Sequence, residues 1–245
     1  MIVSEVAGTT RDSIDVRFEK DGRVFVAIDT AGVRKKSKLA DSIEFYAFTR
    51  AQASIERADV TLLLLDSTKN TSHVEKRLAA HLVEACKPVV IVVNKWDLAK
   101  GHTSTEEYGE YLTKTLPNLD YAPVAFVSAI DDRNVTSAVD VASSLFKQYH
   151  HRVGTGAMNQ ALAAVMAERG PSVKRGLRLP RIYYATQVAT NPPTIVLFVN
   201  DAGAFRQDYL RFLVNRFRSL LPFEEIPIRL VLRARRSTDK TPPSR

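Results

Sequence analysis

The sequence predicts an α/β protein with a doubly wound, mostly parallel sheet, followed by a smaller α+β domain. Strand-like and helix-like segments alternate through the first part, and the run Val89–Val93 is apolar and mostly β-branched, which is typical of a strand buried on both faces. Charge separates the second part from the first. Residues 1–150 carry 19 Lys and Arg against 21 Asp and Glu, whereas residues 151–245 carry 16 against 6.

The elements of the first part follow from hydrophobic period and turn chemistry. Apolar and polar side chains alternate from Ile14 to Glu19, which predicts a half-exposed strand, and Asp21-Gly22 favours a hairpin turn into a more buried strand, Val24–Ile28. Strands then alternate with helices. The expected strands are Val60–Asp66, Val89–Val93 and Val124–Val127. The expected helices run from about Ser42 to Ala58, through Val74, Leu78, Leu82 and Ala85, onward from the capping box Ser104-Thr105-Glu106-Glu107, and through Val135, Val139, Ala142 and Phe146.

The second part begins after a predicted hinge, Gly154-Thr155-Gly156. We expect a helix at Ala157–Arg169, strands at Ile182–Val188 and Thr194–Val199, a helix at Phe205–Leu221 and a strand at Ile228–Leu232. The basic, proline-containing tail 234–245 is expected to be disordered. The excess positive charge indicates a polyanionic partner, and four arginines of the last helix are candidate contacts: Arg206, Arg211, Arg216 and Arg218.

Composition restricts the class of protein. A hydrophobic content of 45% and a charged content of 25% are typical of soluble globular chains. Cys86 is the single cysteine, which excludes a disulfide framework and suits a reducing compartment. No apolar run reaches the length of a membrane span. We therefore expect a cytoplasmic monomer that does not contact membranes.

Three predicted strands end in polar motifs: Asp29-Thr30-Ala31-Gly32, Asn94-Lys95-Trp96-Asp97 and Ser128-Ala129-Ile130. The carboxyl ends of parallel strands are where ligands bind in open α/β sheets. The Asp97 carboxylate can accept hydrogen bonds from the N1–H and the exocyclic amine of guanine, whereas adenine offers no N1–H donor. Asn94 can hold the loop together and reach the base edge, while the Lys95 stem can lie against the purine ring. Asn-Lys-x-Asp alone is more often an ordinary polar turn, but the motifs taken together in this order favour nucleotide binding.

With Gly8-Thr9-Thr10-Arg11-Asp12 ahead of them, these motifs resemble the GTPases of the P-loop superfamily and, within it, the Der (EngA) family of bacterial ribosome-assembly GTPases. That family has two tandem GTPase domains and a C-terminal domain of KH-like fold. The resemblance covers nearly the whole chain. It implies that residues 1–150 are a second GTPase domain, that residues 151–233 are a KH-like domain, and that 234–245 are the tail.

The resemblance also implies ligands and roles. The ligands are GTP or GDP, Mg²⁺ and, for hydrolysis, K⁺. Thr10 and Asp29 would hold the magnesium, and Thr10, Gly32 and Val33 would stand at the site of hydrolysis. The residues that would contact the nucleotide are Asp29, Thr30, Ala31, Gly32, Val33, Asn94, Lys95, Trp96, Asp97, Ser128, Ala129 and Ile130, with the Ala129 N–H directed at the guanine O6.

The chain departs from the family pattern in three places. Val33 stands where many GTPases have a glutamine that orients water, and valine cannot hydrogen-bond water. The 245 residues contain no Gly-x-x-x-x-Gly-Lys-[Ser/Thr], the loop that cradles phosphates, so we expect a C-terminal fragment that lacks the first strand and the P-loop of its sheet. No Gly-x-x-Gly follows Met158, which favours arginine-rich surface contact over the usual KH clamp on RNA.

Two functions from different classes fit these observations. The first is an enzyme, part of a Der-type GTPase that hydrolyses GTP during maturation of the large (50S) ribosomal subunit and binds that subunit or its precursor through rRNA and ribosomal proteins. This chain alone is expected to be inactive, because the P-loop is absent from its 245 residues. The alternative is a nucleotide-inactive module that only docks on the ribosome or on RNA. An ATPase of related fold is disfavoured by Asp97.

Overall fold

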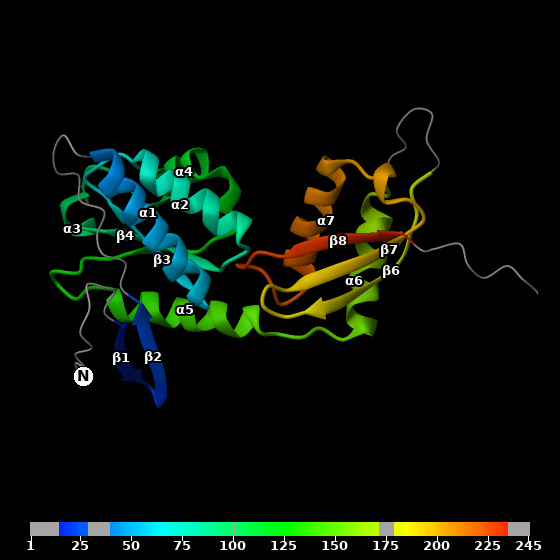
Figure 1. Ribbon diagram of the computed structural model, residues 1–245, viewed down its shortest axis with the longest axis horizontal. Coiled ribbons are helices and arrows are strands. Elements are labelled where there is room, and N and C mark those ends of the chain that lie inside the picture. The colour runs from blue at the N-terminus through cyan, green and yellow to red at the C-terminus, as the bar shows by residue number, and fades with distance from the viewer. Residues whose placement is uncertain (1–14, 29–39, 100, 172–178, 235–245) are drawn as a thin grey trace, which may run out of the picture. The chain divides into compact units, whose positions relative to one another are not determined.

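The computed structural model describes residues 15–28, 40–99, 101–171 and 179–234 (Figure 1). The chain divides into two compact units. The first comprises Met1–Asp120 and Val124–Ala142, and the second comprises Tyr121–Pro123 and Ser143–Arg245, so that the division falls within the helix α5, Val135–Tyr149. Each unit is built around its own three-stranded sheet.

The first unit is organised around β4 (Val89–Asn94), the central strand of a parallel sheet. β4 pairs with β3 (Thr61–Asp66) on one side and with β5 (Val124–Phe126) on the other. All five residues of Val89–Val93 are buried, as the apolar run predicts for a strand covered on both faces. This sheet places the carboxyl ends of its three strands at one edge, which positions the candidate site.

Helices connect and cover these strands. α1 (Ala40–Arg57) precedes β3, and α2 (His73–Glu84) packs against both α1 and β3. α3 (Trp96–Ala99), α4 (Thr105–Thr115) and the 3₁₀ turn η1 (Pro117–Leu119) lie between β4 and β5. α2 and α4 each begin with a capping box, in which the serine side chain accepts from the third helical N–H while the glutamate there accepts from the serine N–H. The box predicted at Ser104 is therefore present, and Ser72 forms a second one.

The hairpin β1 (Asp15–Lys20) and β2 (Arg23–Ile28) forms a separate two-stranded sheet. Its turn is the predicted Asp21-Gly22, and both residues have positive φ, which the paired strands require. The expectation that Val24–Ile28 is the more buried strand is wrong, because Val24 and Val26 are 52% and 56% exposed. β2 pairs with β1 alone among the described residues, so its apolar side chains have no neighbouring strand to cover them.

The second unit is an α+β arrangement of α6 (Thr155–Glu168), β6 (Ile182–Ala189), β7 (Thr194–Val199), the 3₁₀ turn η2 (Ala202–Ala204), α7 (Gln207–Leu220) and β8 (Arg229–Ala234). β7 is the central strand, antiparallel to β6 and parallel to β8. Figure 1 shows α6 and α7 on one face of this sheet. Their buried residues, which include Met158, Leu213 and Phe217, form the core with the inward side chains of β7.

Most boundaries shift by one or two residues from the sequence-based expectation, and two of these shifts change a predicted assignment. Thr155 and Gly156, predicted as part of a hinge, are the first residues of α6, because Gly154 takes the extended N-cap conformation and Asn159 Nδ2 donates to the Thr155 carbonyl oxygen. Ala234, predicted as the start of the tail, is the last residue of β8. The rest of the tail lies outside the described residues.

Within the described ranges every helix is too short or too polar to cross a membrane. The described elements confirm the predicted fold class, an α/β unit with a parallel sheet and a smaller α+β unit.

Candidate nucleotide-binding site

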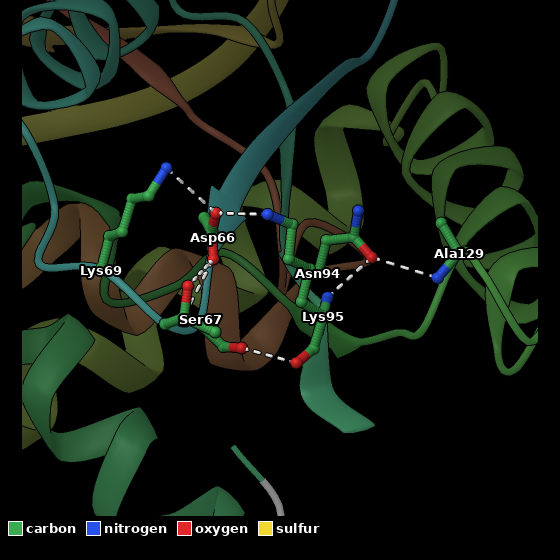
Figure 2. Close-up of polar contacts among 7 residues, drawn as sticks. Asp66, Ser67, Lys69, Asn94, Lys95 and Ala129 are labelled. Atoms are coloured by element: carbon green, nitrogen blue, oxygen red, sulfur yellow. Dashed lines mark hydrogen bonds and ion pairs between the residues drawn. The ribbon is translucent and has the colours of Figure 1, made fainter. Parts of the chain in front are cut away.

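The candidate site is formed by the loops that follow β3, β4 and β5. Asp66 pairs with Asn94 in the parallel register, and Val93 pairs with Phe126, so the three strands end at nearly the same level of the sheet. The sequence motifs at residues 94–97 and 128–130 are thereby brought to one edge, as expected for parallel strands. Figure 2 shows the polar contacts among these loops.

Asn94 joins two of the loops. Its side-chain oxygen Oδ1 accepts hydrogen bonds from the backbone N–H of Lys95, at 2.7 Å, and from that of Ala129, at 3.1 Å (Figure 2). Two donors aimed at one atom fix which end of the amide is the oxygen. The side-chain amine Nδ2 makes no hydrogen bond within the described part of the chain, so it remains available to donate to an acceptor in front of the strand ends.

Lys95 is held at both its backbone and its ammonium group. Its φ of +61° is the left-handed conformation, and its carbonyl oxygen accepts from Ser67 Oγ at 2.8 Å. The Nζ ammonium donates to Asp66 Oδ2 at 2.8 Å. With its charged end anchored on the neighbouring strand, the Lys95 side chain is still 50% exposed. Its methylene stem can therefore serve as an apolar platform for a flat ring.

Asp66 is the acceptor that positions Lys95. The Lys95 ammonium, together with the Thr68 hydroxyl and N–H, holds the pKa of the Asp66 carboxyl well below its usual range. Lys69 lies 3.5 Å from the same carboxylate oxygen. Asp66 is therefore ionised in the folded protein at neutral pH, where it links the ends of β3 and β4.

Asp97 carries a buried oxygen that has no hydrogen-bond partner in the described part of the chain. Its Oδ1 is buried and forms no hydrogen bond among the described residues. A buried carboxylate oxygen is costly to leave unpaired, so such atoms in native proteins call for a partner such as a ligand. Asp97 follows Trp96, whose N–H donates to the Val127 carbonyl oxygen and whose ring packs 4.4 Å from Phe126. Trp96 therefore fixes the start of α3, the short helix that presents Asp97.

The loop after β5 is closed on itself. Ser128 is buried, exchanges two backbone hydrogen bonds with Arg133 and donates from its hydroxyl to Asp131 Oδ2 at 3.0 Å. The Ala129 N–H points to Asn94, so an acceptor such as a carbonyl oxygen would have to share that donor with Asn94 Oδ1. The Ile130 side chain is 87% exposed and makes no core contact.

The remaining predicted site residues lie outside the described residues: Thr10, Asp29, Thr30, Ala31, Gly32 and Val33. Both predicted magnesium ligands, Thr10 and Asp29, are among them. The described residues themselves contain no cluster of three or more His, Cys, Asp or Glu side chains able to hold a metal ion.

Sequence reasoning missed the contribution of Asp66 and Ser67 to this edge. The sequence predicts Asp66 only as the last residue of a strand, because its pairing with Lys95 depends on the register between β3 and β4. The position of Asp66 could have indicated this contribution, because Asp66 ends β3, the strand next to β4 in the sheet. A polar residue at the end of a strand that neighbours an Asn-Lys-x-Asp strand is therefore a candidate for the same site.

Comparison with protein families assigns the two parts of the chain separately. Residues 1–95 match the model described as "50S ribosome-binding GTPase". Residues 152–233 match the model described as "KH-domain-like of EngA bacterial GTPase enzymes, C-terminal".

Curated relatives match along almost the whole chain. The protein called GTPase Der from Rhodopirellula baltica is 46% identical over 235 residues, covering 96% of this chain and 52% of that protein. GTPase Der from Desulforudis audaxviator is 41% identical over 238 residues, covering 97% of this chain and 54% of that protein. The chain therefore spans about half the length of the curated relatives it matches.

Solved structures are more distant. A crystal structure of Era with MgGDPNP and nucleotides 1506–1542 of 16S ribosomal RNA aligns with a TM-score of 0.45 and 20% identity, covering 96% of this chain and 85% of that one. A probable GTP-binding protein, engB, aligns with a TM-score of 0.44 and 16% identity, covering 58% of this chain and 87% of that one.

Proposed function

Because this chain is homologous to the GTPase Der proteins over 96% of its length, we propose that it is the part of a Der-type GTPase that recognises guanine and contacts the ribosome. In this assignment residues 1–150 belong to a GTPase domain, residues 151–233 form a KH-like domain, and 234–245 are a basic tail. The reaction of the whole protein is the hydrolysis of GTP to GDP and phosphate.

The observation that carries the guanine assignment is the unpartnered, buried Oδ1 of Asp97. Guanine presents two adjacent donors, the ring N1–H and the exocyclic amine, and a carboxylate can accept both. Adenine would leave the buried oxygen unpaired, which costs it most of its affinity. The described residues therefore fit guanine by the chemistry of their donors and acceptors.

The neighbouring side chains complete this recognition. The free Nδ2 of Asn94 donates to the purine N7, and the Lys95 stem, anchored through Asp66, covers one face of the ring. The Ala129 N–H is shared between Asn94 and the guanine O6. Ser128 and Ile130 flank Ala129 in the sequence, and Trp96 fixes the start of α3, which carries Asp97.

The phosphate side of the proposal rests on the family assignment. GTP brings Mg²⁺, which would be held by Thr10 and Asp29, and the Asp29–Val33 stretch would lie against the phosphates. Gly32 would offer a backbone N–H to the terminal phosphate. Because Val33 has no group that can orient water, a backbone donor or K⁺ would have to supply that positioning.

The test is nucleotide selectivity measured directly on this chain. Ligand-detected NMR with GDP, ADP and XDP in turn, each competed against the others, detects binding even when it is weak. We expect GDP to bind in preference to ADP and XDP. Equal binding of GDP and ADP would contradict the assignment of Asp97.

For the second part, we propose contact with the large ribosomal subunit or its precursor in the cytoplasm, with the protein acting as a monomer. The basic balance of residues 151–245 and the family description of the first part support this. Co-sedimentation with large subunits should weaken steeply as salt rises, since phosphate contacts release counterions. Salt-insensitive association would contradict an electrostatic contact with rRNA.

A second candidate function is a docking module that does not turn over nucleotide. The observation that favours it is that no Gly-x-x-x-x-Gly-Lys-[Ser/Thr] occurs in these 245 residues. Subunit binding without detectable binding of any guanine nucleotide would establish this candidate for the chain. Hydrolysis of GTP to GDP and phosphate by this chain would exclude it.

A further inference from the structure

The sheet of the second unit has one face that α6 and α7 do not cover, and this face carries aromatic rings and arginines. Cross-strand register places residues of the three strands in rows on this face. Tyr184 of β6 pairs with Phe198 of β7, which pairs with Arg233 of β8. A second row is Thr186, Val196 and Val231, and Thr194 and Arg229 begin a third. The inward residues between them, Ile195, Leu197 and Val199, are fully buried.

The first row is a stack of flat groups. The rings of Tyr184 and Phe198 lie 4.3 Å apart at an interplanar angle of 14°, and the Arg233 guanidinium lies 5.9 Å from the centre of the Phe198 ring. Tyr184 is 42% exposed and stands on β6, which is an edge strand among the described strands, so none of these strands lies beside one face of its ring. Arg233 occupies the opposite edge strand. The stack is therefore open to a further planar group at either end.

The charge on this face is positive and uncompensated. The three strands contain no Asp or Glu. Arg229 and Arg233 are exposed and form no ion pair among the described residues. Exposed aromatic rings flanked by unpaired arginines are the combination that binds single-stranded nucleic acid, because bases stack on the rings and phosphates meet the arginines.

The arginines of α7, by contrast, are largely engaged within the unit. Arg216 pairs with Glu168 at 2.7 Å, and Arg206 pairs with Asp208. Arg218 donates to the Ile226 carbonyl oxygen and lies 4.0 Å over the Tyr121 ring. Of the four arginines that the sequence suggested as polyanion contacts, only Arg211 has no partner among the described residues. Among the described residues of the second unit, the two arginines of the sheet thus remain available for a polyanion, whereas three of the four arginines of α7 are engaged.

We propose that this sheet face binds single-stranded RNA, with bases extending the stack of Tyr184, Phe198 and Arg233, and with Arg229 and Arg233 contacting phosphates. The inference deepens the proposed ribosomal association, because it names the surface and the nucleic-acid conformation recognised. It does not depend on nucleotide binding by the first unit.

The test is binding of a fluorescein-labelled, single-stranded RNA of about 10 nucleotides to the full chain, followed by fluorescence anisotropy. Tyr184→Ala should weaken binding roughly 5- to 100-fold, because stacking on one ring is lost. Tyr184→Phe should bind like the wild type, since it keeps the ring. Arg229→Gln combined with Arg233→Gln should weaken binding and lower the salt dependence, by about one unit of slope for each phosphate contact removed.

Arg211→Gln is the matched control, since it removes one exposed charge from α7 and should leave RNA affinity and salt dependence nearly unchanged. A 2-aminopurine in the RNA reports stacking separately, because its fluorescence falls when the base stacks. That quenching should be lost in Tyr184→Ala. Thermal unfolding of each variant verifies that the fold is retained.

Three outcomes would overturn the inference. The first is equal affinity for single-stranded RNA in Tyr184→Ala and the wild type. The second is tighter binding of duplex than of single-stranded RNA. The third is self-association of the chain that the sheet variants abolish while RNA binding is unaffected.

Co-sedimentation with large ribosomal subunits distinguishes this inference from the proposal of ribosomal association. If the sheet variants co-sediment with subunits as the wild type does, the sheet-face inference fails and the ribosomal association stands. If the wild type binds the oligonucleotide as described but not the subunits, the ribosomal association fails and the sheet-face inference stands.

Discussion

At the scale of single residues, Asn94 connects the loop after β4 to the loop after β5. Its Oδ1 satisfies the N–H groups of Lys95 and Ala129 at once. The short motif indicated that an asparagine here would hold its loop together. It did not indicate that the same oxygen reaches Ala129, because that contact depends on how closely β4 and β5 pair.

Removing the Asn94 amide should destabilise the first unit. Asn94→Ala leaves two backbone N–H groups without their acceptor, so we expect a loss of about 1–3 kcal/mol in the free energy of unfolding. Urea unfolding measures this. Asn118→Ala is the matched control, since Asn118 is exposed in η1 and makes no hydrogen bond among the described residues. Equal losses in the two variants would show that the bridge is energetically unimportant.

The pair of Asp66 and Lys95 has a defined pH dependence. Because Lys95 first and Thr68 next lower the pKa of Asp66 in the folded state, the pair stabilises the protein above the unfolded carboxyl pKa, which is about 4. This stabilisation is lost as the pH falls through the lower folded pKa.

Asp66→Asn should therefore be less stable than the wild type at neutral pH. The difference should shrink in acid, because the carboxyl of the unfolded wild-type chain binds its proton at a higher pH than the carboxyl of the folded chain. Urea unfolding curves at neutral pH and at about pH 3 provide the comparison. A difference that stays constant with pH would show that charge is not what the carboxylate contributes.

The sequence predicts Asn94, Lys95 and Asp97 as neighbours because they belong to one short motif, whereas the role of Ala129 is implied by the family resemblance. It did not predict that Lys95 would be bound by Asp66. Nor did it show that Trp96 would pack on Phe126 and Tyr108, since both facts depend on tertiary register.

At the scale of elements, the strongly patterned segments were predicted to within two residues at most ends. β4 formed from the β-branched run, and α4 began at its capping box. The errors came from segments whose surroundings decide their burial. Val24–Ile28 has the composition of a buried strand, but in the described structure it pairs only with β1.

The capping box of α4 offers a quantitative test at this scale. Ser104→Ala removes the acceptor for the Glu107 N–H, and we expect a loss of about 1 kcal/mol. This should lower the melting temperature of the first unit by roughly 2–4 °C. Ser137→Ala, an exposed position within α5, is the control and should change stability by less than about 0.5 kcal/mol. A larger effect at Ser137 than at Ser104 would contradict the role of the cap.

At the scale of the whole molecule, we expect the rate of amide hydrogen exchange to differ between the central strand of each unit and the hairpin. The slowest amides should be those of Val89–Val93 in the first unit and Ile195–Val199 in the second, because each strand is buried and paired on both sides. The hairpin amides of β1 and β2 should exchange faster, since a two-stranded sheet is marginally stable. Protection of the hairpin equal to that of β4 would contradict this.

The excess of positive charge in residues 151–245 follows directly from the sequence, because counting charged side chains requires no knowledge of the fold. The sequence does not show which surface of the folded unit carries this charge. The helix α7 attracted attention because its arginines recur along the sequence, yet most of them are paired with neighbours. The exposed arginines of the sheet became visible only through the register of β7 and β8.

The central claim is that Asp97 selects guanine, and a swap of nucleotide preference tests it most directly. Asp97→Asn replaces an acceptor by an amide whose N–H can donate to the C2 carbonyl of xanthine, where guanine has an amine. Competition between GDP and XDP, observed by ligand-detected NMR, should shift from GDP toward XDP by at least about 100-fold. Asn118→Ala serves as a control that leaves the preference unchanged. An Asp97→Asn variant that keeps the wild-type preference for GDP would contradict the account.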